Sequence, residues 1–286
     1  MVAIDFGRVA YGLWRFNEND FEAGCAAVEA AREVGITHFD TADVYGHECG
    51  MGSTERLVGR IRKEAPSLFE GATVATKGGI IFGTPYDSSE AYLREAVEAS
   101  LRNLQTEQID LYYIHRPDEL THLRDLAATL DALVAEGKIA NVAVSNFRPQ
   151  QIYGLVRYLK APLVGHQIEF SALHHEPISN GLLDQAMELD FAVPVWSPLA
   201  GGTLFESESR PVLRVREALE AIAIRDGLTV SDVALSFVRS HPSKTVPIVG
   251  TRTPARVREA AAAVERTLSR KDWYAIYEAA RGERMP

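Results

Sequence analysis

Residues 73–115 read TVATKGGIIFGTPYDSSEAYLREAVEASLRNLQTEQIDLYYIH and contain the repeating unit that decides the fold. A short β-rich run at Thr73–Thr76 opens the unit, and a second run at Leu111–His115 closes it. Between them, over Ala91–Leu104, apolar residues recur at the spacing of one helix face. Parallel strands cannot be joined by a tight turn and are usually connected through a helix. Two apolar strands with a helix between them therefore indicate a parallel crossover unit.

The same alternation continues in both directions along the chain. Further strand-like runs lie at Val9–Leu13, His38–Asp40, Asn141–Val144, Val164–Glu169, Ala192–Trp196 and Thr245–Val249. Helical patterns separate them, for example over Leu123–Ala135, and Gly35, Gly137 and Gly227 fall where a helix should end. Eight β units, most of them nearly continuous in apolar residues, indicate parallel strands covered on both faces.

Either a closed barrel or an open doubly wound sheet fits this alternation. A nucleotide-binding open sheet usually carries G-x-G-x-x-G after its first strand, and this sequence has none there. We therefore predict an α/β protein with a (β/α)8 TIM barrel, as one domain spanning residues 1–286. Extra helices are predicted between the seventh and eighth strands, at Leu213–Arg225 and Val230–Ser240, and at the C-terminus.

Composition excludes several other classes of protein. The 286 residues are 46% hydrophobic and 24% charged, as in ordinary globular proteins. The formal net charge of −9 argues against nucleic acid as a partner, because phosphate binding needs a cationic surface. Two cysteines are typical of a reducing compartment, and no apolar run reaches membrane-spanning length. We expect a cytoplasmic protein without a membrane partner, either a monomer or a weak homo-oligomer.

Polar residues follow three successive strand runs, at Asp40, Lys77 and His115. Taken singly, each has an ordinary structural explanation as a helix cap, a solvated charge or a hydrogen-bonded histidine. Lys77, however, closes an apolar strand, and a buried lysine needs a counter-charge such as Asp40 on the neighbouring strand. Because barrel enzymes carry their chemistry at the C-terminal ends of strands, we expect these side chains to meet there.

Tyr45, in the loop after Asp40, would complete a proton-transfer site. A free tyrosine has a pKa of about 10 and is a reluctant acid at neutral pH. We predict that Lys77 lowers the pKa of Tyr45 by stabilising the phenolate, while Asp40 keeps Lys77 charged. His115 could hydrogen-bond a carbonyl oxygen or share the proton. Such a site suits the reduction of a carbonyl by a hydride donor, and we expect no metal ion in it.

The sequence resembles the aldo-keto reductase superfamily over essentially the whole chain, most closely the short-loop bacterial oxidoreductase-type members. The resemblance rests on FDTADVYG at 39–46, TKGG at 76–79, IHRPD at 114–118 and VWSPLAGG at 195–202. It implies a catalytic tetrad in which Tyr45 is the general acid, Lys77 and Asp40 tune it, and His115 orients the substrate carbonyl.

The resemblance also implies that NADP(H) lies directly across the barrel mouth. In this reading Ser145, Asn146 and Gln167 hold the carboxamide and Trp196 stacks on the pyridine ring, although Ser145 and Asn146 could instead cap the next helix. The positions expected to contact the cofactor are Gly12, Trp14, Asp40, Ser145, Asn146, Gln167, Trp196, Ser197, Leu199, Gly250, Thr251, Arg252, Arg256 and Glu259.

The segment after the eighth strand favours NADP over NAD. Thr253 as N-cap and Pro254 as first helical residue predict a helix N-terminus flanked by Arg252 and Arg256, which is a suitable anion site. By the resemblance, this site takes the adenosine 2′-phosphate; the alternative is a solvated basic turn. Ala260 stands where many members have asparagine, so the adenine contacts are expected to be weaker.

The expected activity is reduction of small aldehydes or ketones to alcohols. Two alternatives remain: a sugar or polyol dehydrogenase working through the same site, and an NADP-sensing regulatory subunit. Brief loops predict an open, permissive pocket. The aromatic residues that could line it or belong to the loop core are Tyr11, Phe16, Phe82, Tyr86 and Phe205. About ten residues precede Gly12, which leaves open how the barrel floor is closed.

Overall fold

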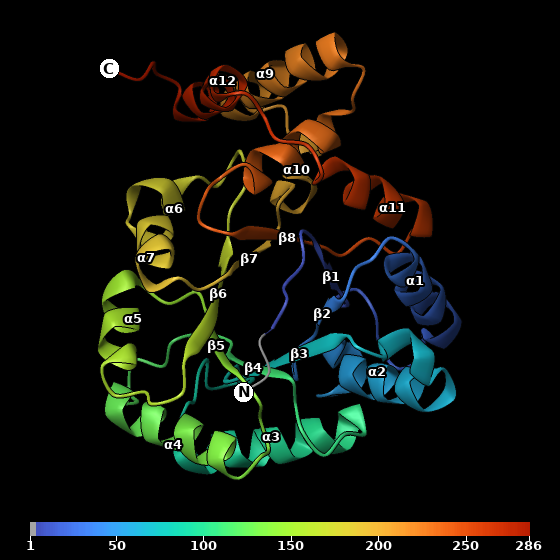
Figure 1. Ribbon diagram of the computed structural model, residues 1–286, viewed down its shortest axis with the longest axis vertical. Helices are drawn as coiled ribbons and strands as arrows, with labels where there is room; N and C mark the ends of the chain where they lie inside the picture. The colour runs from blue at the N-terminus through green and yellow to red at the C-terminus, as the bar shows by residue number, and fades with distance from the viewer. Residues whose placement is uncertain (1–3) are drawn as a thin grey trace.

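A computed structural model, which describes residues 4–286, contains eight parallel strands closed into a barrel in chain order. The strands are β1 (Ala10–Gly12), β2 (His38–Asp40), β3 (Thr73–Gly78), β4 (Leu111–Ile114), β5 (Val142–Ser145), β6 (Leu163–Glu169), β7 (Val193–Trp196) and β8 (Thr245–Val249). Parallel pairing of β1 with β8, where Tyr11 lies opposite Val249, closes the ring. The predicted (β/α)8 barrel is confirmed, and Figure 1 shows its strands surrounded by helices.

Helices connect the strands on the outside of the barrel. They are α1 (Phe21–Glu33), α2 (Ser53–Glu64), α3 (Glu90–Leu104), α4 (Leu123–Ala135), α5 (Pro149–Val156), α6 (Glu176–Ser179), α7 (Leu182–Leu189), α8 (Thr203–Glu206), α9 (Arg210–Asp226), α10 (Val230–Arg239), α11 (Pro254–Ala263) and α12 (Arg270–Arg281). Three short 3₁₀ segments, η1 (His47–Cys49), η2 (Pro66–Phe69) and η3 (Ala200–Gly202), lie among them.

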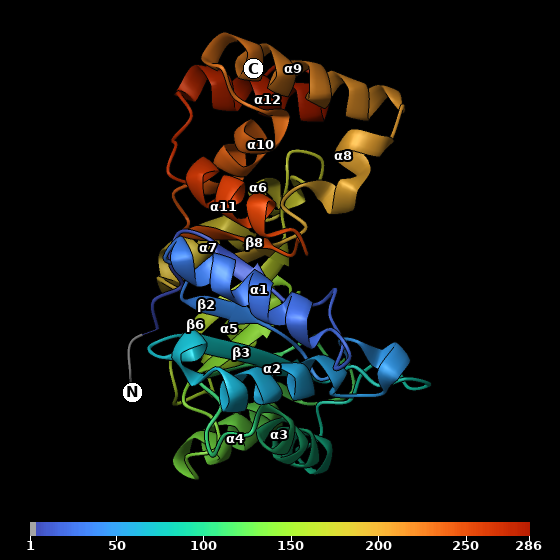
Figure 2. The same cartoon turned by 90° about the vertical axis from the view of Figure 1, so that its right-hand side faces the viewer.

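The predicted extra helices are present as α9 and α10 between β7 and β8, and as α12 at the C-terminal end. The short helix α8, which directly follows η3, was not predicted, because four residues carry no helical periodicity. Figures 1 and 2 both show α9 and α12 packed against each other beyond the ring of barrel helices.

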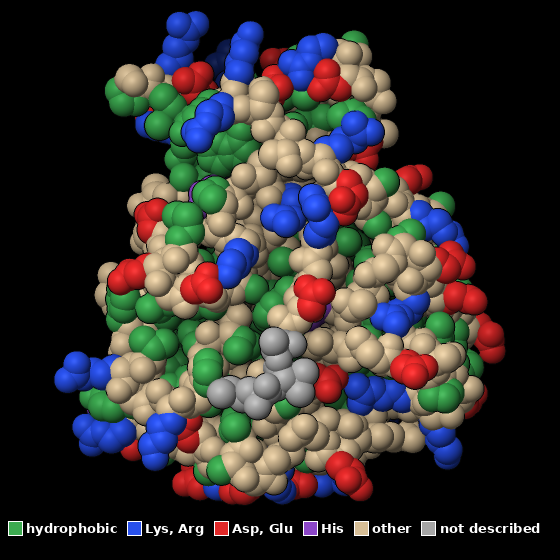
Figure 3. Space-filling view, in the orientation of Figure 1, with side chains coloured by type: hydrophobic (Ala, Val, Ile, Leu, Met, Phe, Trp, Pro, Cys, Tyr) green, Lys and Arg blue, Asp and Glu red, His purple; other side chains and the backbone are tan. Residues whose placement is uncertain are grey.

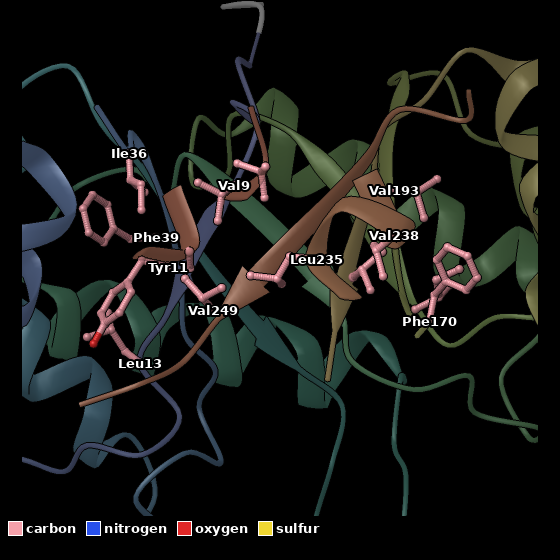
Figure 4. Packing of buried hydrophobic residues seen from close by; sticks show 14 of the residues in the cluster. Val9, Tyr11, Leu13, Ile36, Phe39, Phe170, Val193, Leu235, Val238 and Val249 are labelled. Atoms are coloured by element: carbon pink, nitrogen blue, oxygen red, sulfur yellow. The ribbon is translucent and has the colours of Figure 1, made fainter. Parts of the chain in front are cut away.

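Outward-facing strand residues form the main core beneath the helices. The rings of Tyr11 on β1 and Phe39 on β2 meet edge to face, with 6.4 Å between their centres. Figure 4 shows these two residues close together, and it shows Leu235 and Val238 of α10 above the strands β7 and β8. Burial of this apolar layer on both sides explains why the strand runs are so continuously apolar.

The floor of the barrel is closed by Phe6, in the segment before β1. Phe6 is buried and stacks on the imidazole of His38, with 4.9 Å between the ring centres. A Cβ atom at Gly165 on β6 would lie 3.1 Å from the Phe6 ring, so glycine there makes room for the plug. The short N-terminal segment therefore fills the floor with one aromatic side chain.

Charged side chains of both signs are interspersed over the face of the molecule seen in Figure 3. Within residues 4–286, no helix is both long enough and apolar enough to cross a membrane. Both cysteines, Cys25 and Cys49, are free thiols.

Candidate active site

The four predicted catalytic side chains come together at the C-terminal ends of three neighbouring strands. Asp40 is the last residue of β2, Lys77 lies near the end of β3, and His115 directly follows β4. The strands β2, β3 and β4 pair in that order. Because side chains alternate along a strand, Lys77 points into the barrel while its neighbours face the outer helices. Tyr45 reaches the same place from the loop after β2.

Lys77 links Asp40 to Tyr45 through its ammonium group. The Nζ atom lies 2.7 Å from Asp40 Oδ2, 2.8 Å from the carbonyl oxygen of Thr41 and 3.1 Å from the Tyr45 hydroxyl oxygen. Lys77 is completely buried, so its three N–H groups depend on these three partners. Burial disfavours the ammonium, but Asp40 and Tyr45 outweigh it and raise the pKa of Lys77. Lys77 is therefore charged at neutral pH.

The net direction of the Tyr45 pKa shift corrects the prediction from the sequence. Burial raises the pKa of Tyr45 above its ordinary value, and the opposing effect of Lys77 is smaller. The predicted net decrease was wrong because the sequence reveals the neighbouring ammonium and not the withdrawal of the phenol from water. Tyr45 consequently keeps its proton at neutral pH, which is the state that a proton donor needs.

His115 is a neutral imidazole facing Tyr45. The two rings meet edge to face, with 5.8 Å between their centres. Burial, followed by the charges of Lys77 and Arg116, holds the pKa of His115 well below its usual range. Its buried Nδ1 atom has no hydrogen-bond partner among residues 4–286. A neutral histidine can donate one N–H to a carbonyl oxygen, as the predicted orienting role requires.

The loop that carries Tyr45 is fixed at both of its sides. The N–H group of Asp43 donates to the carbonyl oxygen of Lys77 at 3.0 Å, which attaches the loop to β3. Gly46 has a φ of 69°, and a Cβ atom there would lie 3.0 Å from the carbonyl oxygen of Phe16. Glycine is needed at this position because both the backbone angle and the close approach exclude a side chain.

Ser145, Asn146, Gln167 and Trp196 form a hydrogen-bond network beside Asp40. Gln167 Nε2 donates to Asp40 Oδ1 at 2.7 Å, Asn146 Nδ2 donates to Ser145 Oγ at 2.7 Å, and Trp196 Nε1 donates to Asn146 Oδ1 at 3.1 Å. The N-cap of α5 lies beyond Ser145 and Asn146, so neither residue caps that helix. This concentration of amide and hydroxyl groups next to the catalytic carboxylate fits a carboxamide ligand.

The N-terminus of α11 fits an anion. Thr253 and Pro254 hold the predicted N-cap and first-helical positions, but the Thr253 side chain makes no capping hydrogen bond. Its own N–H group instead donates to Thr251 Oγ1 at 3.2 Å. Arg256 and Glu259 are exposed on the helix, and the Arg256 guanidinium forms no hydrogen bond or ion pair with the described residues. Free N–H groups and an unpaired cation therefore coincide here.

Arg252 is engaged elsewhere. Its guanidinium forms an ion pair with Asp20 at 2.6 Å and lies over the ring of Phe16, 4.8 Å from the centre. Of the two arginines expected to meet a phosphate, Arg256 is the one available to a ligand.

Gly12, Gly250 and Trp14 form a close-packed corner where β1 and β8 end. A Cβ atom at Gly12 would lie 2.8 Å from Ile248 Cγ2, and one at Gly250 would lie 2.9 Å from Trp14 Nε1. Trp14 is 53% exposed, and the Arg15 guanidinium lies 4.4 Å from the centre of its ring. Glycine is needed at both positions because neighbouring side chains of the protein fill the space that a Cβ atom would occupy.

The remaining predicted contacts follow β7. Ser197 has a left-handed backbone with a φ of 50°, and Leu199 packs partly against the main core. Of the aromatic residues considered for the pocket, Tyr11 and Phe16 are buried in the core, so they do not line it. The other three are exposed: Phe82 and Tyr86 lie in the segment between β3 and α3, and Phe205 lies in the short helix α8.

Two ionisable residues beside the site had been given no role from the sequence. Burial and the nearby Glu55 raise the pKa of Asp43 to about 8. The guanidinium carbon of Arg116 lies 5.8 Å from the centre of the Trp196 ring. Their positions in the sequence could have indicated that they lie near the site. Asp43 stands two residues before Tyr45 in FDTADVYG, and Arg116 directly follows His115 in IHRPD.

Comparison with known proteins identifies the family. The model of the Aldo/keto reductase family matches residues 8–281. A 6-dehydroglucose reductase from Novosphingobium aromaticivorans is 42% identical over 282 residues, which cover 97% of this chain and 93% of that protein. A 6-dehydroglucose reductase from Agrobacterium fabrum is 35% identical, with 99% and 97% covered.

A glycerol dehydrogenase from Gluconobacter oxydans has a similar structure, with a TM-score of 0.85, 27% identity, and 97% of this chain and 92% of that chain covered. The resemblance inferred from the sequence motifs is confirmed. The chain therefore belongs to the aldo/keto reductase family and is an oxidoreductase that works with a nicotinamide cofactor.

Proposed function

We propose that this enzyme reduces small, polyhydroxylated aldehydes with NADPH and that Tyr45 donates the proton. The observation that carries the proposal is the hydroxyl of Tyr45, which keeps its proton at neutral pH and lies 3.1 Å from the Lys77 ammonium. An acid held beside a buried cation can protonate an oxygen that becomes negatively charged, and the cation then stabilises the phenolate that is left.

Each residue of the tetrad has a defined part in this proposal. When bound, the nicotinamide supplies the hydride that reduces the carbonyl carbon. His115 donates an N–H to the carbonyl oxygen and orients it, and Tyr45 transfers its proton to that same oxygen. Lys77 stabilises the resulting tyrosinate, while Asp40 holds Lys77 in place at 2.7 Å. Burial of Lys77 and Asp40 makes these electrostatic effects stronger than they would be in water.

The preference for NADPH over NADH rests on Arg256. The residues around Ser145 and Gln167 suit the nicotinamide end that both cofactors share. Arg256, unpaired at the uncapped start of α11, suits the 2′-phosphate that NADPH alone carries.

The substrate class and the direction rest on different observations. Two relatives that align over nearly the whole chain are named 6-dehydroglucose reductases, which supports an aldehyde derived from a sugar. The raised pKa of Tyr45 favours reduction at neutral pH, since alcohol oxidation needs the tyrosinate as base. Polyol oxidation is the second candidate, favoured by the structural similarity to a glycerol dehydrogenase. A purely regulatory role would not require the proton-transfer geometry of the tetrad.

The test is an assay of NADPH and NADH oxidation with 6-dehydroglucose, glyceraldehyde, propanal and benzaldehyde, together with the reverse reaction on glycerol. We expect turnover with the hydroxylated aldehydes, a preference for NADPH, and slower oxidation of glycerol at neutral pH. Binding of NADPH is followed separately through quenching of tryptophan fluorescence, because Trp196 would stack on the nicotinamide. Tight binding without turnover on any aldehyde would contradict the proposal and favour the regulatory alternative.

A further inference from the structure

Arg116 places a guanidinium group at the barrel mouth, next to the catalytic residues. It directly follows His115 and is half-buried. Its guanidinium carbon lies 5.8 Å from the centre of the Trp196 ring, and Trp196 is itself held by a hydrogen bond of 3.1 Å to Asn146. The charge of Arg116 also acts on the site. It opposes the burial that raises the pKa of Tyr45, and it contributes to the low pKa of His115.

The guanidinium has donors to spare. Among residues 4–286 it forms no hydrogen bond and no ion pair. Its acidic neighbour in the loop, Glu119, is paired with Arg148 at 3.1 Å. A planar guanidinium presents its N–H groups as a fork, which matches two neighbouring oxygen atoms of one ligand. A half-buried fork without a protein partner is suited to bind part of the substrate.

We propose that Arg116 binds two adjacent hydroxyl oxygens of the aldehyde and so selects polyhydroxylated substrates. This inference rests on the proposed function and specifies which residue recognises the substrate class. Neutral oxygens are favoured over an anion because, within residues 4–286, the neighbouring cations Lys77 and Arg148 are already paired, with Asp40 and Glu119 respectively.

The experiment compares glyceraldehyde, which carries two adjacent hydroxyls, with propanal, which has the same carbon chain and none. In Arg116→Met, we expect kcat/KM for glyceraldehyde to fall about tenfold or more, the loss typical of two hydrogen bonds. We expect kcat/KM for propanal to change less than about threefold, so that the ratio between the two substrates falls. Comparing this ratio in Arg116→Met with the same ratio in the wild type cancels the intrinsic difference in reactivity between the two aldehydes.

Three controls define what Arg116 does. Affinity for NADPH should be unchanged in Arg116→Met, because the proposed contact is with the substrate. Arg148→Met removes another cation from the same rim and should leave the substrate ratio as in the wild type. Arg116→Lys keeps the charge without the fork, so it should retain the wild-type pH profile and still lose selectivity. In Arg116→Met, the alkaline limb of the profile should move to higher pH.

Each contrary result identifies a different error. Equal losses on glyceraldehyde and propanal, or a loss of NADPH affinity, would overturn substrate recognition by Arg116. A loss confined to succinic semialdehyde, an anionic aldehyde of similar size, would show that Arg116 selects charge instead of hydroxyl groups. If the wild-type enzyme reduces none of these aldehydes, the proposed function fails first, before any variant is compared, and this inference fails with it.

Discussion

Gln167 on β6 donates a hydrogen bond of 2.7 Å to Asp40 on β2, across the interior of the barrel. Asp40 uses its other oxygen for Lys77, also at 2.7 Å. The carboxylate is thus shared between the amide proposed to hold the cofactor and the ammonium proposed to tune Tyr45. One residue therefore couples the cofactor end of the site to the proton-transfer end.

Replacing Gln167 with Leu should weaken both ends at once. Asp40 would lose a buried donor, so the free energy of unfolding should fall by about 1–3 kcal/mol. Affinity for NADPH should fall as well, because the side chain proposed to contact the nicotinamide carboxamide is removed. The matched control is Gln185→Leu, since Gln185 on α7 is also buried and donates to the Pro149 carbonyl oxygen at the start of α5, at 2.9 Å. That variant should lose stability and keep NADPH affinity. Identical NADPH affinities in the two variants would refute the shared role of Gln167.

Replacing Lys77 with Met should remove both activity and stability. The carboxylate of Asp40 would remain buried without its counter-charge, which typically costs about 3–5 kcal/mol. The double variant Lys77→Met with Asp40→Asn should recover much of this stability, because no unpaired charge is left, and it should stay inactive. Urea unfolding and a standard turnover assay measure the two effects. If Lys77→Met alone unfolds at the same urea concentration as the wild type, Asp40 is not left as an unpaired buried charge and the ion pair does not stabilise the fold.

Replacing Arg256 with Ala should distinguish the two nicotinamide cofactors. A charge-assisted hydrogen bond to phosphate contributes roughly 1.5–3 kcal/mol, so NADPH binding should weaken about tenfold or more. NADH binding should be nearly unchanged. Arg258→Ala is the matched control on the same helix, because the guanidinium of Arg258 is paired with Glu33. Equal losses for both cofactors in Arg256→Ala would mean that Arg256 does not contact the 2′-phosphate.

Asp43 should make the protein less stable as the pH rises. Its pKa is about 8 in the folded protein, chiefly because of burial, whereas an unfolded aspartate has a pKa of about 4. The folded state therefore holds a proton that the unfolded state has released, and stability falls from about pH 4 to about pH 8. One such group can change the free energy of unfolding by at most about 1.4 kcal/mol per pH unit.

The variant Asp43→Asn should reduce this slope and be more stable than the wild type near pH 8. Thermal unfolding at a series of pH values measures both quantities. If the stability difference between the two proteins is the same at pH 5 and pH 8, Asp43 does not hold a proton in the folded state.

The sequence predicted those features that depend on residues near one another in the chain. The strand-like runs His38–Asp40 and Thr245–Val249 coincide with β2 and β8. The second of these is almost entirely apolar, because a buried parallel strand has no polar face to interrupt the run. The meeting of Asp40, Lys77 and His115 was predictable because each stands at a strand end, where the fold places chemistry. Tyr45 was predictable because it lies in the loop that directly follows Asp40.

Features that depend on three-dimensional packing were not predictable. Phe6 closes the barrel floor, yet a single aromatic residue in an irregular segment carries no periodic signal. The pairing of Arg252 with Asp20 joins residues far apart in the sequence, and nothing local marks it. The direction of the Tyr45 pKa shift depends on how burial compares with the nearby charge, which only the folded geometry defines.

The most direct test of the account is the turnover of Tyr45→Phe with saturating NADPH and a good aldehyde substrate. The substitution removes the hydroxyl that donates the proton and leaves the cofactor residues in place. General acid catalysis contributes about 10²–10⁴-fold, so kcat should fall by at least the lower of these factors. The affinity for NADPH and the free energy of unfolding should stay close to those of the wild type. A Tyr45→Phe enzyme that keeps more than about a tenth of the wild-type kcat would contradict the assignment of Tyr45 as the proton donor.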